Sequence, residues 1–332
     1  MGTIAAATGA PHARIMGMGS YRPSRLVPNS EVVDAIDSSD EWIQQRSGIK
    51  TRRWAGPEES VQMMSVEASR IAIERAGLDA AQIDCVVVAT VSHLLQTPAV
   101  ATAIAHELGT DAAAFDISAA CSGFCHGIAL ASDLVRAGSA HHVLVVGVER
   151  LTDILDLTDR GTAFIFADGA GAAVVGPSET AGIGPVVWGS DGEQFDLIRQ
   201  KEDWRDVLKQ EMPSMPHLVM QGNPVFRWAS YEMAKIAQAT LDRTGITVDD
   251  LDVFVPHQAN MRIIDAMARA MKLPEKVRIA RDIAEQGNTS AASIPLALDR
   301  MIEEGEAKSG DTALFIAFGA GLAYAAQVVT VP

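Results

Sequence analysis

Residues 115 to 125 have the sequence FDISAACSGFC, and this stretch decides the fold. Its first three residues are typical of the end of a short strand, and small residues follow them up to Gly123. From Phe124 onward the apolar residues are spaced as on one face of a helix, which ends at the glycine of Ala137-Gly138. Cys121 is therefore predicted to lie where a strand passes into a helix, at or near the first helical residue.

The start of a helix is a favourable place for a reactive thiol. Unpaired backbone N–H groups and the positive end of the helix dipole lie there. We therefore predict that the pKa of Cys121 is lowered from the value of about 8.5 of a free thiol. Its small neighbours would let a substrate carbonyl approach the backbone closely. The alternative is a buried structural cysteine, which is the commoner role of a lone cysteine.

The composition limits the class of protein. The chain has 332 residues, 48% of them hydrophobic, which is enough for two domains of ordinary size or one large duplicated one. Its net charge of −15 argues against nucleic acid as a partner. Cys85, Cys121 and Cys125 do not make a disulfide framework, and neither a signal-peptide core nor a membrane-spanning apolar run is present. We therefore expect a cytoplasmic protein with no membrane partner.

The second part of the chain repeats the plan of the first. Residues 74–88 resemble residues 242–256, at the offset of 168 that separates Gly77 from Gly245. Residues 118–121 resemble 290–293, and residues 144–147 resemble 316–319, both at an offset of 172. Matches in one fixed order indicate an internal duplication of alternating strands and helices, with sheets covered by helices. The two small-residue helices are expected to be buried face to face between the sheets.

This repeat divides the chain into three parts. We expect residues 1–13 to be an N-terminal extension. Residues 14–177 are then the half that carries the cysteine, and residues 178–332 form the second half. Inside that half, the polar stretch 188–221 is expected to be an irregular excursion over the surface.

Two polar clusters in the second half lie at predicted strand ends. His257 follows the apolar run 253–256 and aligns with Ala89 in the repeat. Asn288 lies in a glycine-containing turn, five residues before Ser293, which this alignment makes the equivalent of Cys121. Pseudo-symmetry is therefore expected to bring Cys121, His257 and Asn288 to one region. The bare amides of residues 318–321 are natural oxyanion donors.

These residues carry a family resemblance. Residues 119–124 (AACSGF), 256–260 (PHQAN) and 287–293 (GNTSAAS) resemble the three signatures of β-ketoacyl-[acyl carrier protein] synthase III, the condensing enzyme that starts bacterial fatty-acid synthesis. The similarity extends from about residue 14 to residue 331. It departs from the family at Ser122, where alanine is common, and at Ala320, where some members have a third glycine. Both residues are small, so the expected chemistry is unaffected.

The resemblance implies a fold and a reaction. The fold would be the thiolase-like five-layer αβαβα arrangement, in which each duplicated half has a mixed β-sheet and a buried central helix. In the reaction, the Cys121 thiolate takes an acyl group from acyl-CoA, and malonyl-[acyl carrier protein] then loses CO2 and attacks the thioester, giving 3-oxoacyl-[acyl carrier protein]. His257 and Asn288 would stabilise the enolate, and the amides of Cys121 and Gly321 would hold the oxyanion. The resemblance also implies a homodimer that needs no cofactor, since CoA thioesters are substrates, and metal-ligand spacing is absent from the sequence.

Further roles follow from the same resemblance. Around the adenine end of CoA we expect Trp42, Arg46 and Arg160. Arg262 is expected both in the pantetheine channel and in the docking patch for the acidic carrier protein. The channel residues are expected to be Asn223, Phe226, Asn260 and Arg262, and the patch residues Arg227, Arg262 and Arg269. Thr97 occupies the place, before a proline, where a family loop crosses the dimer interface and closes the partner's acyl pocket. Threonine instead of phenylalanine there favours longer or branched starters over acetyl.

Other functions compete with this one. Cysteine, histidine and asparagine in this order also describe papain-like cysteine hydrolases, but the papain-type surroundings of the cysteine are missing. A redox pair of Cys121 and Cys125 is disfavoured because no Cys-x-x-Cys spacing exists. A non-catalytic binding protein is disfavoured because the catalytic set is complete. A starter-unit synthase of a polyketide pathway has the same chemistry and stays open.

Overall fold

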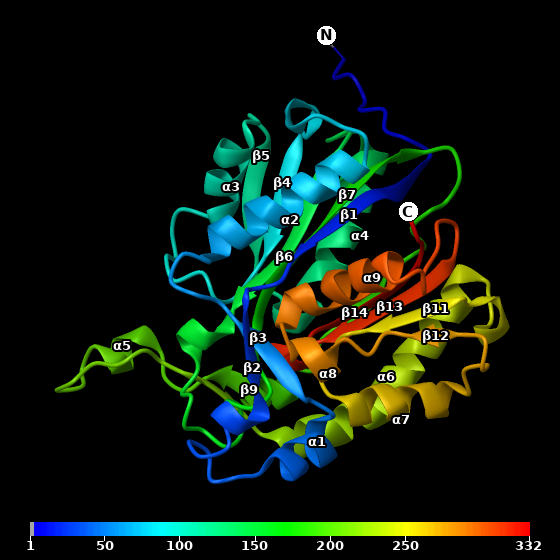
Figure 1. Ribbon diagram of the computed structural model, residues 1–332. Helices are drawn as coiled ribbons and strands as arrows, with labels where there is room; N and C mark the ends of the chain where they lie inside the picture. The colour runs from blue at the N-terminus through cyan, green and yellow to red at the C-terminus, as the bar shows by residue number, and fades with distance from the viewer. Residues whose placement is uncertain (1–2) are drawn as a thin grey trace.

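Two five-stranded sheets form the frame of the protein in a computed structural model that describes residues 3–332 (Figure 1). In the first sheet the spatial order is β1 (His12–Tyr21), β7 (Asp168–Ser178), β6 (Val143–Arg150), β4 (Cys85–Ala89) and β5 (Ala113–Ile117). In the second it is β8 (Val187–Gly189), β14 (Tyr324–Thr330), β13 (Thr312–Phe318), β11 (Val253–Pro256) and β12 (Arg278–Ile279).

The two sheets have the same topology, strand for strand. In the first, β5, β4 and β6 are parallel, and β7 and β1 are antiparallel to their neighbours. In the second, β12, β11 and β13 are parallel, and β14 and β8 are antiparallel. The expected duplication is therefore present, and both sheets are mixed.

The register of the duplication differs from the sequence alignment. The 3₁₀ turn Ala120–Ser122 corresponds to Ser290–Ala292, since each turn begins on a left-handed residue, Ala120 with φ 46° and Ser290 with φ 49°. The offset there is 170, so the equivalent of Cys121 is Ala291 and not Ser293. The sequence alignment was wrong by two residues, because runs of alanine and serine are too uniform to fix the register. The pairing of β4 with β6 and of β11 with β13 requires the offsets of these two strand equivalences to differ by two. The expected offset of 168 for Ala89 and His257 therefore agrees with an offset of 170 for β6 and β13. The expected offset of 172 for residues 144–147 and 316–319 was wrong by two.

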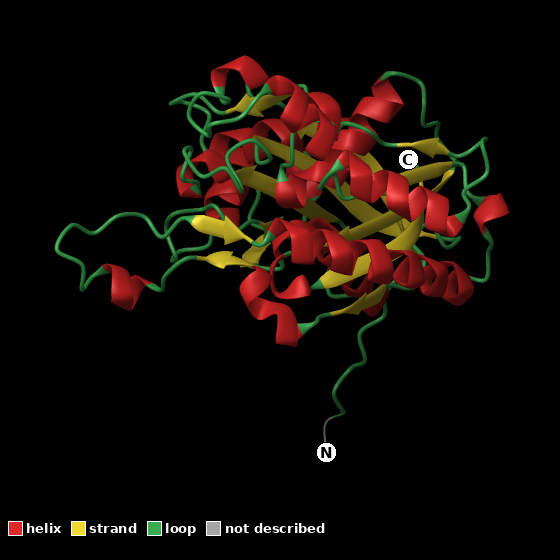
Figure 2. Ribbon diagram, turned by 90° about the horizontal axis from the view of Figure 1, so that it is seen from below, coloured by secondary structure: helices red, strands yellow, loops and turns green. Residues whose placement is uncertain are grey.

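Helices alternate with the sheets in five layers (Figure 2). Residues of α2 (Val61–Arg75) and α3 (Val100–Leu108) pack on the outer face of the first sheet, and those of α6 (Gly222–Thr244) and α7 (Met261–Met271) pack on the outer face of the second. Between the sheets lie α4 (Gly123–Ala137) and α9 (Ser293–Glu303). The expected αβαβα fold is confirmed, with the two small-residue helices in the central layer.

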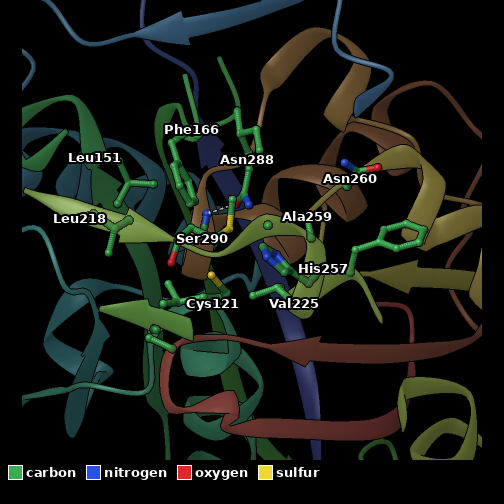
Figure 3. Close-up of a pocket in the computed structure, with 18 of the residues that line it drawn as sticks. Cys121, Leu151, Phe166, Leu218, Val225, His257, Ala259, Asn260, Asn288 and Ser290 are labelled. Atoms are coloured by element: carbon green, nitrogen blue, oxygen red, sulfur yellow. Dashed lines mark hydrogen bonds between the residues drawn. The ribbon is translucent and has the colours of Figure 1, made fainter. Parts of the chain in front are cut away.

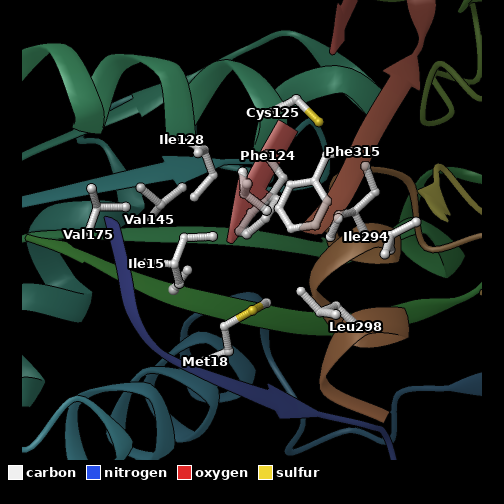
Figure 4. Packing of buried hydrophobic residues seen from close by; sticks show 14 of the residues in the cluster. Ile15, Met18, Phe124, Cys125, Ile128, Val145, Val175, Ile294, Leu298 and Phe315 are labelled. Carbon is white, nitrogen blue, oxygen red and sulfur yellow. The ribbon is translucent and has the colours of Figure 1, made fainter. Parts of the chain in front are cut away.

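The central layer is held by apolar side chains from both halves (Figure 4). Phe124 of α4 meets Phe315 of β13 with ring centroids 6.4 Å apart, and both side chains are fully buried. Burying a side chain of this size contributes about 1.5–3 kcal/mol. This shared core fixes the start of α4, and with it Cys121, against the second half.

Several short helices and strands lie at the end of the sheets where the loops of both halves meet. They are α1 (Asp40–Ser47), β2 (Arg25–Pro28), β3 (Thr51–Trp54), α8 (Ile283–Gln286), β9 (Ile198–Gln200), β10 (Leu218–Met220) and α5 (Trp204–Val207). The segment 201–217 with α5 projects from the body (Figure 1). The expected irregular excursion 188–221 was wrong at its start, because Trp188 belongs to β8 and pairs with Ala325 at the edge of the second sheet. It was also wrong near its end, because β9 and β10 pair as a small antiparallel sheet.

The expected boundaries of the chain fall at or near the ends of strands. The first strand begins at His12, two residues before the expected start of the first half at residue 14, and residues 1 and 2 of the expected extension lie outside the described part. The boundary after residue 177 falls at the end of β7, and as a domain boundary it stays a prediction. Within residues 3–332, every helix is too short or too polar to cross a lipid bilayer.

Candidate active site

A cavity of about 570 Å³ takes its lining from both halves of the chain. Cys121, His257 and Asn288 all lie on its wall, although β11 and the turn before α9 are far from α4 in the sequence (Figure 3). Because the duplicated sheets point the same strand ends toward this region, the three side chains converge as predicted.

Cys121 lies in the 3₁₀ turn that leads into α4. The backbone of Gly319 passes so close that a Cβ there would lie 2.5 Å from the Cys121 nitrogen, so only glycine fits. Burial of the sulfur raises the pKa of the Cys121 thiol to about 12, although the residue as a whole keeps partial solvent contact. A hydrogen bond with Ser290 and the cysteine's own backbone amide lower the pKa, and the charge of Glu149 raises it. The expected lowering was therefore wrong in sign, since desolvation outweighs the helix start.

His257 follows β11 and is held from several sides. Its ring Nδ1 lies 2.6 Å from Ser293 Oγ, and its ring edge meets Phe318 with centroids 5.8 Å apart. Burial lowers the pKa of His257 to about 3, so the ring is neutral near pH 7. The Gln258 N–H donates to Ser293 Oγ at 3.3 Å, which directs the hydroxyl proton of Ser293 toward Nδ1. We infer that the proton of the His257 ring is on Nε2, where it can be donated into the cavity.

Asn288 is held by hydrogen bonds with backbone groups of neighbouring residues. Its N–H donates to Ile165 O and its carbonyl accepts from Ala167 N–H, both at 2.9 Å, which joins the turn to the neighbouring chain segment. Its side-chain Oδ1 accepts the Ser290 N–H at 2.8 Å (Figure 3). Because the oxygen is engaged, the NH2 group of Asn288 is the part that can donate to a ligand.

The outer part of the cavity contains the residues expected around CoA. The Arg160 and Arg46 guanidinium carbons lie 4.9 Å and 5.7 Å from the Trp42 ring centroid. Arg262 lies 4.8 Å over Phe226. Cations stacked on half-buried aromatic rings form a surface suited to a phosphorylated heteroaromatic group. The cavity wall includes the expected set Trp42, Arg46, Arg160, Asn223, Phe226, Asn260 and Arg262.

Asn260 also has a structural role that the sequence did not indicate. Its Oδ1 caps α7 by accepting the Arg262 N–H at 2.9 Å, and its Nδ2 donates to Arg46 O at 2.9 Å. The residue therefore ties α7 to α1 while lining the channel.

Four expected residues do not line this cavity. Thr97, Arg227 and Arg269 are exposed to solvent on the described chain. Gly321 is also absent from the cavity wall, where its neighbour Ala320 is present. Because Ala320 lies on the cavity wall and the N–H of Gly319 is engaged with Ala323 O, the Ala320 amide is the candidate for the second oxyanion donor in this stretch.

Sequence reasoning missed three polar side chains beside the nucleophile. Ser293 holds His257, and Ser290 contacts both Cys121 and the fully buried carboxylate of Glu149. The signal for Glu149 was a charged residue directly after the apolar run 143–148. Ser290 and Ser293 were masked by their alanine-rich surroundings.

Comparison with known proteins agrees with this geometry. Residues 115–192 match the family described as 3-oxoacyl-[acyl-carrier-protein] synthase III, and residues 241–331 match the description of its C-terminal part. The chain is 59% identical to β-ketoacyl-[acyl-carrier-protein] synthase III 1 of Streptomyces coelicolor, with 100% of both chains covered. It is 53% identical to the mycobacterial β-ketoacyl-[acyl-carrier-protein] synthase III of Mycobacterium avium, covering 100% of this chain and 99% of the other.

Solved structures give the same result for the fold. The priming β-ketosynthase of a polyketide biosynthetic pathway superposes with a TM-score of 0.96 at 49% identity, covering 100% of this chain and 99% of the other. The 3-oxoacyl-[acyl-carrier-protein] synthase III of Aquifex aeolicus superposes with a TM-score of 0.88 at 35% identity, covering 96% of this chain and 100% of the other.

Proposed function

Because the chain belongs to the β-ketoacyl-[acyl-carrier-protein] synthase III family, we propose that it condenses an acyl-CoA starter with malonyl-[acyl carrier protein]. The products are 3-oxoacyl-[acyl carrier protein], CoA and CO2, and the reaction starts fatty-acid synthesis. One observation carries the proposal: a thiol, a neutral imidazole and an oriented amide, from both halves of the fold, share one cavity wall.

The first half-reaction transfers the acyl group to Cys121. The CoA nucleotide lies against Trp42 and Arg160, and the thioester reaches the sulfur through the channel. As Cys121 attacks, negative charge develops on the thioester oxygen, where the amides of Cys121 and Ala320 donate hydrogen bonds. The tetrahedral intermediate collapses to acyl-Cys121 and releases CoA.

The second half-reaction uses His257 and Asn288. The malonyl thioester oxygen lies between the Nε2–H of His257 and the NH2 group of Asn288, and both donate to it. Loss of CO2 turns this oxygen into an enolate, so the two fixed donors stabilise charge that develops only in the transition state. The enolate carbon then attacks acyl-Cys121 and frees the thiolate.

The reaction is tested by separating its two stages. Incubation with acyl-CoA alone should add one acyl group to the protein, located on Cys121 by peptide mass spectrometry. Addition of malonyl-[acyl carrier protein] should then remove that group and give 3-oxoacyl-[acyl carrier protein] and CO2. Removal by water at the same rate without malonyl-[acyl carrier protein] would instead indicate a cysteine hydrolase.

A second candidate, priming of a polyketide pathway, is favoured by the close superposition on a priming β-ketosynthase. It uses the same site and chemistry, so the site residues do not separate the two. The separating measurement is turnover with carrier proteins from the two kinds of pathway. At least a tenfold preference in kcat/KM for one carrier protein would decide the pathway.

We propose that the enzyme is a homodimer joined along β5. This strand lies at the edge of the first sheet. Phe115 on it is 39% exposed, and Leu95 in the loop after β4 is 63% exposed. An open strand edge with exposed apolar side chains is a template for pairing with a second copy. We also place the enzyme in the cytoplasm, since its cysteines are free thiols and acyl-CoA and carrier protein are its substrates.

The carrier protein is proposed to dock at Arg227, Arg262 and Arg269. Reversal of Arg269 and Arg227 to glutamate should raise the KM for malonyl-[acyl carrier protein] by about fivefold to tenfold at low salt, because attraction between exposed charges is screened by salt. The KM for malonyl on a small thiol carrier should change much less. These two residues give the cleaner test, since Arg262 also lines the cavity.

Arg70→Glu on the opposite face is the matched control, because Arg70 is an exposed arginine that has only a weak contact with Glu67 at 3.9 Å. It should leave both KM values unchanged. Equal effects of the docking variants on both malonyl carriers would rule the patch out.

Starter choice is proposed to depend on Thr97, which is exposed on this chain and would close the acyl pocket of the partner subunit. A threonine in place of a phenyl ring leaves room for several methylenes, each worth roughly 0.8 kcal/mol when buried. A branched starter should gain about 2 kcal/mol over acetyl, or about thirtyfold. Competition between acetyl-CoA and isobutyryl-CoA for Cys121 measures this ratio, which Thr97→Phe should reverse. An acetyl preference that Thr97→Phe leaves unchanged would refute the assignment.

A further inference from the structure

The buried carboxylate of Glu149 lies near the nucleophile, with Ser290 between the two groups. Glu149, at the end of β6, is 0% exposed. Its Oε2 accepts hydrogen bonds from Ser92 Oγ at 2.6 Å and Val91 N–H at 3.1 Å, with Thr90 Oγ1 at 3.2 Å. Its Oε1 accepts from Ser290 Oγ at 3.1 Å. A carboxylate that is fully enclosed and forms no ion pair within residues 3–332 is costly to bury, so its presence beside the nucleophile needs an explanation.

Ser290 connects this carboxylate to the reacting sulfur. The Ser290 side chain lies on the cavity wall beside Cys121 (Figure 3), and its hydroxyl is close enough to act on the thiol and lower the pKa of Cys121. A serine hydroxyl has only one proton, which here is directed to Glu149. While the thiol is protonated, its proton therefore faces the lone pairs of Ser290 Oγ. Once the thiolate forms, the Ser290 hydroxyl can turn and donate to the sulfur, which is the interaction that lowers the pKa of Cys121. Cys121, Ser290 and Glu149 thus form a continuous path from sulfur to carboxylate.

The protonation states of the site require such an acceptor. Burial raises the pKa of Cys121 to about 12, so the thiol must lose a proton as it attacks. His257 is a poor base, because burial lowers its pKa to about 3. Burial raises the pKa of Glu149 to about 7, near the value at which a general base works best in neutral solution.

We propose that Glu149 takes the proton of Cys121 through the Ser290 hydroxyl during acylation and returns it when the thiolate is freed; this rests on the function proposed above. In the first step the S–H bond breaks, Ser290 Oγ accepts that proton and passes its own to Glu149, and the sulfur forms the thioester. The departing CoA thiolate takes a proton from water. In the second step the enolate displaces the Cys121 thiolate, which recovers its proton from Glu149 by the same path. Glu149 touches no substrate and acts only through Ser290.

Within residues 3–332, the hydrogen-bond partners of the Glu149 carboxylate are uncharged, and its charge acts on the thiol of Cys121. The elements packed against Glu149 present Thr90, Val91 and Ser92 from the loop after β4, and Ser290 from the turn before α9, all uncharged. The neighbouring Arg150 directs its guanidinium to Asp153, at 3.2 Å. The protonation of Glu149 is therefore coupled to Cys121, whose pKa it raises.

Alkylation of the full enzyme by iodoacetamide, followed across pH 5 to 10, tests the relay without any turnover. In the parent, Cys121 should react faster as pH rises through about 7, where Glu149 becomes able to accept the proton. In Glu149→Gln this rise should be lost, and reactivity near pH 8 should fall about a hundredfold. Ser290→Ala should behave in the same way, and the double variant should be no slower than either single one, because the residues act in one path.

Two further measurements separate a relay from a structural role. CoA release in the first turnover with acyl-CoA should slow about a hundredfold in Glu149→Gln and recover in part in Glu149→Asp, which keeps the carboxylate. Malonyl decarboxylation in a Cys121→Ala background should change less than about twofold when Glu149→Gln is added, since no thiol proton moves. An unchanged alkylation profile, or equal losses of acylation and decarboxylation, would overturn the relay. Acylation failing in the parent would contradict the proposed function, while the alkylation profile would still test the relay.

Discussion

Replacing Cys121 by alanine is expected to reduce acyl transfer from acyl-CoA by at least about a thousandfold, to an undetectable level. The sulfur is the atom that forms the covalent intermediate, and removal of a nucleophile costs factors of this size or larger. Malonyl decarboxylation should persist at a slow rate. His257 is held by Ser293, and the Asn288 side chain by the Ser290 backbone, so neither donor depends on the cysteine side chain. Peptide mass spectrometry and CO2 release measure the two activities separately.

Cys125→Ala is the matched control for this variant. Cys125 lies one helical turn further along, fully buried in the core between the sheets and outside the cavity (Figure 4). Its removal should leave acyl transfer to Cys121 intact and lower the stability by about 1 kcal/mol. An acyl-enzyme that forms in Cys121→Ala would show that another residue is the nucleophile.

Replacing His257 or Asn288 by alanine is expected to have the opposite pattern. Decarboxylation of malonyl-[acyl carrier protein] should fall by about 10²–10³, which is the usual cost of removing one donor to a developing oxyanion. Acylation of Cys121 should be partly kept, since its oxyanion donors are backbone amides. The comparison of CO2 release with first-turnover CoA release shows which half-reaction is affected. Decarboxylation at the parental rate in His257→Ala would exclude the assigned role.

The pH dependence of decarboxylation checks the state of His257. Burial holds its pKa at about 3, so the ring stays neutral and keeps a single proton throughout the working range. In a Cys121→Ala background, the rate should therefore be flat from about pH 5 to pH 8. A decline with a midpoint near 6.5, the ordinary histidine value, would mean that the ring titrates as an exposed imidazole does.

The sequence by itself determined the plan of the fold and the identity of the reacting groups. The alternation of apolar runs and helical patterns predicted a duplicated α/β protein, because side-chain periodicity follows directly from helix and strand geometry. Cys121, His257 and Asn288 were recognised because each lies in a short contiguous motif at a strand end or in a turn. Local signals of this kind need no knowledge of distant neighbours.

Only the tertiary structure decided the register of the repeat and the electrostatics of the site. Runs of alanine and serine fit two alignments, and the backbone of the two 3₁₀ turns selects the one that pairs Cys121 with Ala291. The pKa of Cys121 depends on burial and on groups from β6 and from the turn before α9, which are far from it in the sequence. Desolvation and Coulomb interactions act through space over a few ångströms, so the order of residues along the chain does not contain them until the chain has folded.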